Sequence, residues 1–253
     1  MSNILAIAQK ELKAYFASPI AYVVIAFFAG LYGYFYVVML SFFQRVSLQM
    51  QMGGQQSANV NEMMIRPLMQ NVLILVLFIM PMVTMRTYAE EKRAGTIELL
   101  LTSPITDWQI VLGKFLGAMV LYAITLGVTL VHMALLFFYG TPEWKPIATA
   151  YLGLYLFGGC FISVGMFISS LTKNQIIAGM STFGVFLFLW VINWIGSFYP
   201  SIEKLTNYLS VVQHADDFWK GVIDTTHLIY YVSFMILGLF LTAKSVDTER
   251  WRG

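Results

Sequence analysis

Charged residues are scarce in this chain, and their scarcity excludes a water-soluble fold. Asp, Glu, Lys and Arg make up 11% of the 253 residues and hydrophobic residues 58%, whereas soluble domains contain about a quarter charged residues. A soluble protein of this length could not bury so much apolar surface. Aromatic residues reach 16%, which suits side chains that face lipid or lie at the depth of the headgroups. The composition predicts an integral membrane protein in contact with membrane lipid.

Cysteine and clustered basic residues are also lacking. The single cysteine, Cys160, lies in an apolar run, so an intrachain disulfide and a cysteine-based metal site are excluded, and we interpret it as a packing residue. The net charge is +2, and the basic residues are scattered instead of forming the stripe of a nucleic-acid-binding protein. We therefore expect no nucleic-acid partner.

Motifs for catalysis and cofactor binding are missing as well. No Gly-x-x-x-x-Gly-Lys-Ser/Thr stretch occurs, so the chain lacks the backbone cradle and the lysine that hold nucleotide phosphates. His214, Asp216 and Asp217 lie close in sequence, but their spacing fits no dedicated metal site. Phe218 and Trp219 beside them favour a surface helix anchored at the headgroups. We expect no enzymatic activity, no cofactor and no metal on this chain.

Long apolar runs are what the sequence has in abundance. Six of them reach or approach the roughly 20 helical residues that cross a hydrocarbon core of about 30 Å. Lipid cannot satisfy backbone polar groups, and the runs lack the alternation of barrel strands, so we expect an all-α fold with six transmembrane helices. The first run is too long for a signal-peptide core, and we expect it to be retained. The expected spans are residues 20–43, 69–85, 110–138, 147–171, 176–198 and 228–243.

Basic residues indicate the orientation, because cytoplasmic loops are enriched in Lys and Arg. An even number of spans places both termini on one side of the membrane. That side holds ten basic residues and the other side five, so we expect both termini in the cytoplasm. The ten are Lys10, Lys13, Arg86, Lys92, Arg93, Lys114, Lys173, Lys244, Arg250 and Arg252, and the five are Arg45, Arg66, Lys145, Lys204 and Lys220.

Residues 1–19 have the pattern of an amphipathic helix. Apolar side chains fall on one helical face, which predicts a helix that lies on the inner leaflet. Ser18-Pro19 predicts a bend before the first span, because proline ends or kinks a helix; an unbroken extension of that span is the alternative. The side chains expected on the polar face are Gln9, Lys10, Glu11 and Lys13.

Two of the expected outer connections differ in character. Residues 44–66 are rich in Gln, Met, Ser and Asn and contain Gly53 and Gly54, so we expect a mobile loop. Residues 199–226 carry apolar side chains at intervals of three and four, which indicates short helices at the outer surface.

Few polar groups lie inside the expected spans. An ionisable residue in a span is by default a functional candidate. His132, however, has no Asp or Glu near it in its own helix, so a hydrogen-bonded packing histidine is favoured over a proton relay. Gly113 and Gly117 would allow another helix to approach closely. Three further residues are candidates for hydrogen bonds between helices: Asn193, Thr125 and Thr129.

The most distinctive stretch is residues 86–109, between the second and third spans. Gly95 is suited to end one helix and Thr96 to cap the next, while Pro104 would stop it. Residues 106–109, Thr-Asp-Trp-Gln, have the form of a capping box that opens the third span. We therefore expect a cytoplasmic helix of about two turns, roughly 12 Å long, over residues 96–103.

This short helix is unusually apolar for a solvated segment. We expect it to expose four apolar side chains, more surface than a short loop should leave in water, so a partner or the membrane should cover it. A loop tucked against the bundle without a partner is the alternative. The four are Ile97, Leu99, Leu100 and Leu101.

The same stretch carries a family resemblance. Glu-Glu-Lys-x-x-Gly-Thr-x-Glu-x-Leu-Leu-x-x-Pro, read from Glu90 to Pro104, resembles the signature of ABC-2 type transporter permeases. Further matches are the stretch from Lys10 to Pro19 and Gly221-Val-Ile-Asp224. They extend over nearly the whole chain and imply a single ABC-2 type transmembrane domain, residues 1–253. Within the family, the chain is most similar to permeases associated with bacterial gliding motility.

The resemblance implies a function for the short helix. In ABC-2 permeases it is the coupling element that sits in a groove of a separate ATPase subunit, which binds ATP and Mg²⁺, and two permease subunits form the path. The implied partners are an ABC ATPase, a second copy or a homologous permease, and an extracytoplasmic accessory protein, in a bacterial inner membrane. The residues that map onto the coupling element are Glu90, Glu91, Gly95, Thr96, Ile97, Glu98, Leu99, Leu100 and Leu101.

Three functions remain open at this stage. The resemblance favours an ATP-driven permease, and export as its direction. A mechanical or scaffolding subunit, which would move an outer partner without passing a substrate, is the second reading. An ion-coupled carrier or intramembrane enzyme is the third, but it predicts paired charges or a nucleophile-base set inside the spans, and the sequence shows neither.

Overall fold

The computed structural model of the chain describes residues 2–54, 59–199 and 201–252, except for the side chains of Ser2, Leu101, Ser197 and Arg252. This described part is built of helices and contains no strand. The helices are α1 (Ser2–Ala17), α2 (Pro19–Met52), a π-helical turn (Asn61–Ile65), α3 (Arg66–Thr84), α4 (Ala89–Ala94), α5 (Ile97–Leu101), α6 (Asp107–Tyr139), α7 (Trp144–Ser170), α8 (Gln175–Phe198), α9 (Glu203–Leu209), a 3-10 turn (Gln213–Ala215), α10 (Asp216–Trp219) and α11 (Thr225–Arg252).

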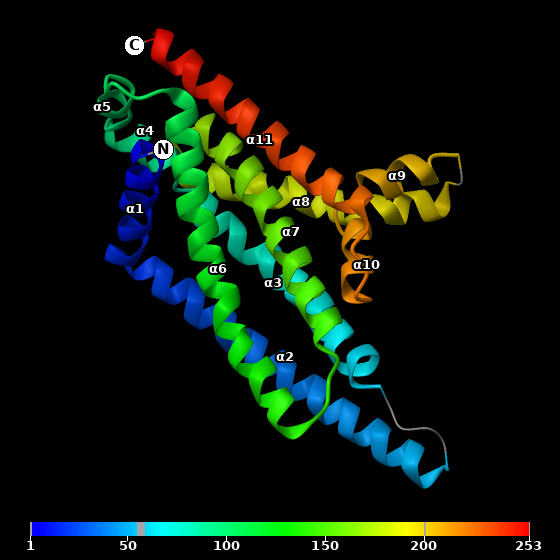
Figure 1. The fold of residues 1–253 in the computed structure, drawn as a ribbon. Helices are drawn as coiled ribbons and strands as arrows, with labels where there is room; N and C mark the ends of the chain where they lie inside the picture. Colours follow the sequence, from blue (N-terminus) through cyan, green and yellow to red (C-terminus); the bar gives the residue numbers. More distant parts are fainter. Residues whose placement is uncertain (1, 55–58, 200, 253) are drawn as a thin grey trace.

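Six helical segments are long and apolar enough to cross a membrane, which confirms the predicted all-α fold with six spans. Their order along the chain places the α4–α5 connection and both termini at one end of the bundle (Figure 1). The segments are Pro19–Met52, Asn61–Ala94, Asp107–Tyr139, Trp144–Ser170, Gln175–Gly196 and Thr225–Trp251.

Two helices, α2 and α11, extend far beyond the ranges that the sequence predicted. The polar stretch after residue 43 was expected to be a loop, but α2 continues through it to Met52, where the Gly53 N–H donates to the carbonyl of Gln49 at 3.0 Å. Residues 44–52 contain neither Gly nor Pro, so the polarity of this stretch does not by itself end the helix. The expectation of a mobile loop is therefore wrong for residues 44–52 and also for residues 60–66, which are helical. Residues 55–58 lie outside the described part. The last helix likewise begins at Thr225, before the predicted start at residue 228.

Helix α7 is enclosed by its neighbours: it runs between α6 and α11 (Figure 1) and also packs against α3 and α8. Small residues on α7 make this enclosure possible, because they leave room for side chains from its neighbours. A Cβ atom at Gly158 would collide with the ring of Tyr122, and one at Gly153 would lie 2.8 Å from the Cβ of Phe218. The α10 helix thereby packs against α7. Residues 199–226 contain short helices, as expected, and their position at the outer surface stays a prediction.

The N-terminal helix packs on the N-terminal half of α6. The predicted bend is confirmed: Ser18 is extended (φ −98°, ψ 148°), and its hydroxyl accepts the N–H of Ile20 at 3.4 Å. Gly113 and Gly117 lie on the face of α6 that α1 covers. A Cβ at Gly113 would come within 2.6 Å of Ile7, and one at Gly117 within 2.9 Å of Glu11. The two glycines therefore permit the close approach that their spacing predicted.

We predict that Gly117→Ala lowers the free energy of unfolding by about 1–3 kcal/mol, because the added methyl overpacks the contact between α1 and α6. Equilibrium unfolding in lipid or detergent measures the change. Gly127→Ala on the same helix is the matched control, since a Cβ there meets nothing within 4 Å, and its effect should stay within about 1 kcal/mol. Equal effects of the two substitutions would contradict the tight α1–α6 contact.

Candidate functional site

The connection between α3 and α6 begins at a hydroxyl supplied by another helix. The first N–H groups of α4 have no partner within that helix. Ser169 of α7 accepts two of them, from Tyr88 at 3.1 Å and Ala89 at 3.0 Å, and donates to the carbonyl of Met85 at 3.0 Å. The start of α4 is thereby fixed to α7 by a side chain that lies about 80 residues away in sequence.

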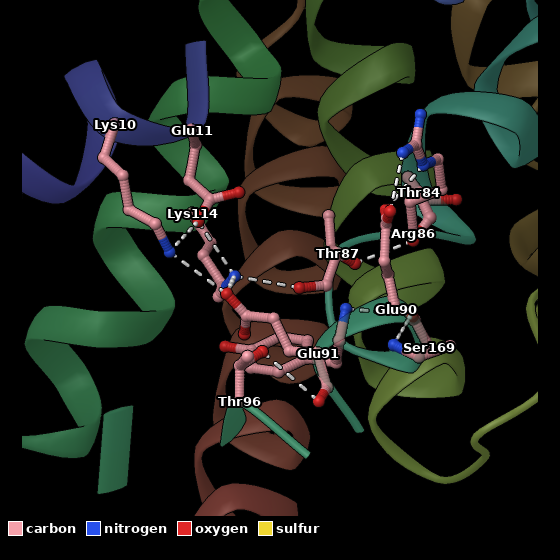
Figure 2. A network of polar contacts seen from close by, with 12 residues as sticks. Lys10, Glu11, Thr84, Arg86, Thr87, Glu90, Glu91, Thr96, Lys114 and Ser169 are labelled. Atoms are coloured by element: carbon pink, nitrogen blue, oxygen red, sulfur yellow. Dashed lines mark hydrogen bonds and ion pairs between the residues drawn. The ribbon is translucent and has the colours of Figure 1, made fainter. Parts of the chain in front are cut away.

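A buried group of charges, which we term the Lys114 cluster, joins α4 to α1 and α6. It consists of Lys10, Glu11, Glu91 and Lys114 (Figure 2). The Nζ of Lys114 lies 3.0 Å from Oε1 of Glu11 and 2.9 Å from Oε1 of Glu91, and it donates to the carbonyl of Thr87 at 2.9 Å. Lys10 lies 3.2 Å from Glu91 and 3.4 Å from Glu11. Three helices distant in sequence therefore meet at one ammonium group.

The Lys114 cluster pairs its buried charges internally, although Oε2 of Glu91 is buried without a hydrogen-bond partner. The Lys114 side chain is 1% exposed, and its three donors meet three oxygen atoms, which is all that an ammonium group offers. Two lysines and two glutamates balance each other. Burial lowers the pKa of Lys10, but the carboxylates of Glu91 and Glu11 outweigh that effect and raise it. Loss of one partner would leave a buried charge uncompensated, which costs far more than the intact pair contributes.

Further ion pairs hold the rest of the connection. Arg86 binds Glu90 with two parallel hydrogen bonds of 2.6 and 2.7 Å and donates to the hydroxyl of Ser18 at 3.2 Å. This pair ties the end of α3 to the bend between α1 and α2.

On the opposite side, the last turns of α11 hold the connection. Lys92 lies 2.8 Å from Glu249, and its side chain is nearly buried. Arg250 pairs with Asp107 at 2.8 Å and donates to the carbonyl of Ile105 at 3.2 Å. The connection is thus fixed to α11 both before and after α5.

The ends of α4 and α5 follow the sequence signals in part. Gly95 has φ +71° and ends α4, and the Thr96 N–H donates to the carbonyl of Glu91 at 3.0 Å, as predicted for a left-handed glycine. Thr96 precedes α5 but does not cap it, because its hydroxyl turns back toward Glu91. The helix itself has five residues, Ile97–Leu101, and not the two turns expected. The capping box of Thr106 and Gln109 is confirmed.

The expected exposure of α5 is wrong for two residues. Ile97 is 7% exposed, and Leu100 is half-buried against the core, whereas Leu99 is 72% exposed. Positions three apart share a helix face, so Ile97 and Leu100 both turn toward the bundle. Gly95, Thr96 and Glu98 are exposed, and the side chain of Leu101 lies outside the described part. The free surface of α5 is therefore centred on Glu98 and Leu99.

The predicted site residues divide into two groups in the structure: those in and next to α5, described above, and the two glutamates of α4. Glu90 and Glu91 pair with cations of this chain, so the geometry gives them a positioning role for α4. The sequence reasoning missed Glu11, which was expected on the polar face of α1, and Lys114, which was counted only as a basic residue near the connection. Both had a signal: Glu11 follows Ile7 and precedes Tyr15 by four residues, on the buried face, and Lys114 lies inside the third expected span.

Interpretations of isolated residues also have outcomes. Cys160 is buried, as expected. His132 packs against the rings of Tyr32 and Tyr36, with centroids 5.2 Å from each, but its Nδ1 is buried without the hydrogen-bond partner that we expected. Thr129 bonds the Tyr151 hydroxyl of α7 at 2.6 Å. Thr125, in contrast, bonds the carbonyl of Leu121 in its own helix, and the prediction for Asn193 stays a prediction.

Two outer residues differ from the interpretation. Phe218 and Trp219 are 0% and 4% exposed, so they are core residues and not headgroup anchors. They pack inward because α10 lies on α7, where the Phe218 carbonyl accepts the hydroxyl of Thr149 at 2.7 Å. Among the residues that the structure describes, no group of three or more His, Cys, Asp or Glu side chains is placed to hold a metal ion.

Comparison with known proteins gives matches of two kinds. The model of a family described as "ABC-2 family transporter protein" matches residues 5–246. Two Escherichia coli proteins, from strains K12 and O157:H7, are each named "Probable multidrug ABC transporter permease YbhR". Each is 27% identical to the chain over 146 residues, which is 55% of this chain and 38% of the relative. The chain therefore matches well under half the length of these relatives.

We predict that Lys114→Met lowers the free energy of unfolding by about 3–5 kcal/mol, because Glu11 and Glu91 would remain buried without their cation. Lys10→Met is the matched control: the Lys10 side chain is 59% exposed, and loss of such a pair costs within about 1 kcal/mol. Equilibrium unfolding of both variants measures the difference. If Lys114→Met were as mild as Lys10→Met, the Lys114 cluster would not hold the three helices together.

Proposed function

Because the chain belongs to the ABC-2 family of transporter proteins, we propose that it is a permease subunit that couples ATP hydrolysis on a separate ATPase to movement of a substrate across the membrane. The observation that carries this proposal is the construction of α5. Its exposed residues, Glu98 and Leu99, stand at the end of the bundle that holds both termini, and α4 beside it is tied to three spans or flanking helices.

The proposed coupling runs from α5 into the bundle. Leu99 is an exposed apolar side chain that a groove on an ATPase would cover. A displacement of α5 would be passed to α4, and from there to α1 and α6 through the Lys114 cluster and to α11 through Lys92 and Glu249. Packed interfaces of this kind respond as discrete shifts and not as continuous deformation. The proposed displacement of α5 therefore moves α4, α1, α6 and α11 as a unit.

The location of the nucleotide follows from what the chain lacks. No phosphate-binding loop occurs in the sequence, so the partner ATPase would bind ATP and Mg²⁺. The end of the bundle with α5 would face the cytoplasm, since ten of the fifteen basic residues were assigned to that side. A bacterial inner membrane is the location that fits this arrangement.

Pairing of two permease subunits would complete the path. In the most apolar windows of α2 and α8, only 22% of the residues are buried, against 67% for α3 and α7. These two helices are therefore the surfaces available for lipid or for a second permease, either another copy or a homologue. The relatives are named as multidrug permeases, so we propose export of drug-like or lipid-like compounds. An outer accessory protein is a further proposed partner.

We predict that Leu99→Arg reduces the amount of ATPase chain that co-purifies with the protein by roughly tenfold or more, because loss of a central apolar contact weakens an interface strongly. Quantification of both chains after purification from native membranes measures the effect. Met52→Arg is the matched control, since Met52 is 88% exposed at the opposite end of α2. Insertion of both variants into the membrane should be unchanged.

A direct transport assay separates the two remaining functions. ATP-dependent accumulation of a fluorescent drug in inverted vesicles, lost in the Leu99→Arg variant, is the expected result. ATP hydrolysis that responds to Leu99→Arg without accumulation of any tested compound would favour the mechanical subunit. Normal association of the ATPase with the Leu99→Arg variant would contradict the role of α5 in either function.

A further inference from the structure

Two histidines meet at the opposite end of the bundle from α5. His214 lies in the 3-10 turn before α10, and His227 lies in the first turn of α11. Their Nδ1 atoms are 2.8 Å apart, which is a hydrogen-bond distance. The Nε2 atom of His214 lies 3.0 Å from the carbonyl oxygen of Tyr208, and that of His227 lies 3.0 Å from Oδ2 of Asp217. A continuous chain of hydrogen bonds therefore joins α9, the 3-10 turn, α11 and α10.

The ring of His214 is held in place by its neighbours. It is stacked on Tyr230, with ring centroids 3.8 Å apart and planes 19° from parallel, and the residue is 5% exposed. Both of its nitrogens have a partner, so a half-turn of the ring would replace two hydrogen bonds with C–H groups. The geometry thus determines which nitrogen faces His227.

Counting protons along this chain gives a definite charge. The carbonyl of Tyr208 can only accept, so Nε2 of His214 must donate. The carboxylate of Asp217 is also an acceptor, because its hydrogen bonds with Lys220 and His227 lower its pKa despite partial burial. Nε2 of His227 must therefore donate as well. One further proton is needed between the two Nδ1 atoms, so the two rings share three protons and one positive charge.

The surroundings indicate which ring carries that charge. Burial lowers the pKa of His214, and the charge of His227 lowers it further, against the opposing effect of the Tyr208 carbonyl. The buried His214 ring is therefore the less favourable place for the positive charge. The charged and titratable groups around the pair, from every element packed against it, are Asp216, Asp217, Lys220, Asp224, Arg66, Tyr208, Tyr230, Tyr231 and Cys160.

We propose that His214 and His227 form a binding site for one proton, and that this proton fastens the outer segment of α9 and α10 to the start of α11. Without it, two nitrogen lone pairs would face each other at 2.8 Å. With a second proton between the rings, two N–H groups would face each other. The hydrogen bond between the two rings exists in one protonation state only. It is present while one shared proton lies between the two Nδ1 atoms, and it is lost as rising pH removes that proton.

A metal ion is the alternative ligand for two converging imidazoles, because metal-bound histidines also donate their second N–H to carboxylates and carbonyls. The described residues supply no third ligand to this pair. The short separation of the two nitrogens fits a shared proton directly. The geometry therefore favours the proton.

Nitrogen NMR of the full chain in lipid nanodiscs tests the proposal, with ¹⁵N in the histidine rings. The sequence contains three histidines, so the signal that disappears in the His132→Gln variant belongs to His132. This variant is also the control that leaves the pair intact. We expect a scalar coupling across an N–H···N bond between His214 and His227, with one ring doubly protonated. Raising the pH should remove the coupling and one proton together.

The same pH titration gives a second readout that needs no variant. After correction for the intrinsic pH dependence of amide exchange, the protection factors of the backbone amides in residues 210–224 should fall by about tenfold when the proton is lost, as expected for a hydrogen bond to a charged group. His214→Gln should abolish the coupling and make this exchange independent of that titration. Absence of the coupling at every pH at which the protein stays folded would overturn the proposal. So would a shift of both Nδ1 signals on addition of Zn²⁺ alone to a metal-free sample that lacks the coupling.

Discussion

The ion pairs of the buried Lys114 ammonium are the interaction on which the end of the bundle with both termini depends. Charges are costly inside a lipid-embedded protein and persist where they are paired. Here one cation meets Glu11 of α1 and Glu91 of α4. Because Gly113 and Gly117 let α1 approach α6 closely, the carboxylate of Glu11 reaches the cation. Packing and electrostatics therefore specify the same arrangement, and α4 has a fixed position from which to hold α5.

The short α5 helix gains its properties from this fixed surrounding. Five residues are too few to form a stable helix alone, so its order comes from α4, from the inward contacts of Ile97 and from the loop held by Arg250. Among the α5 side chains that the structure describes, Glu98 and Leu99 form the outward surface. A motif that reads as an apolar patch is therefore a small contact on a rigid base. That combination suits an element that transmits force better than one that binds by area.

The spans and most helix ends could be predicted from the sequence, because they depend on local signals. Long apolar runs, Gly95, Ser18-Pro19 and the capping box at Thr106 each act within a few residues. The Lys114 cluster could not, because Lys114 and Glu11 are separated by 103 positions. The prediction of which α5 side chains are exposed was wrong for a similar reason. The pattern shows that its residues are apolar, but only tertiary packing decides which of them face the bundle. The predicted end of α2 was wrong because polar residues do not by themselves end a helix.

A distance measurement across the Lys114 cluster tests the central claim most directly. Spin labels at Lys13 of α1 and Arg93 of α4, both exposed, report whether the two helices move together in the complex with the ATPase. The account predicts one narrow distance distribution, unchanged between nucleotide-free and ATP-bound states, which broadens when Lys114 is replaced by Met. Separation of α4 from α1 on ATP binding in the wild-type protein would contradict it.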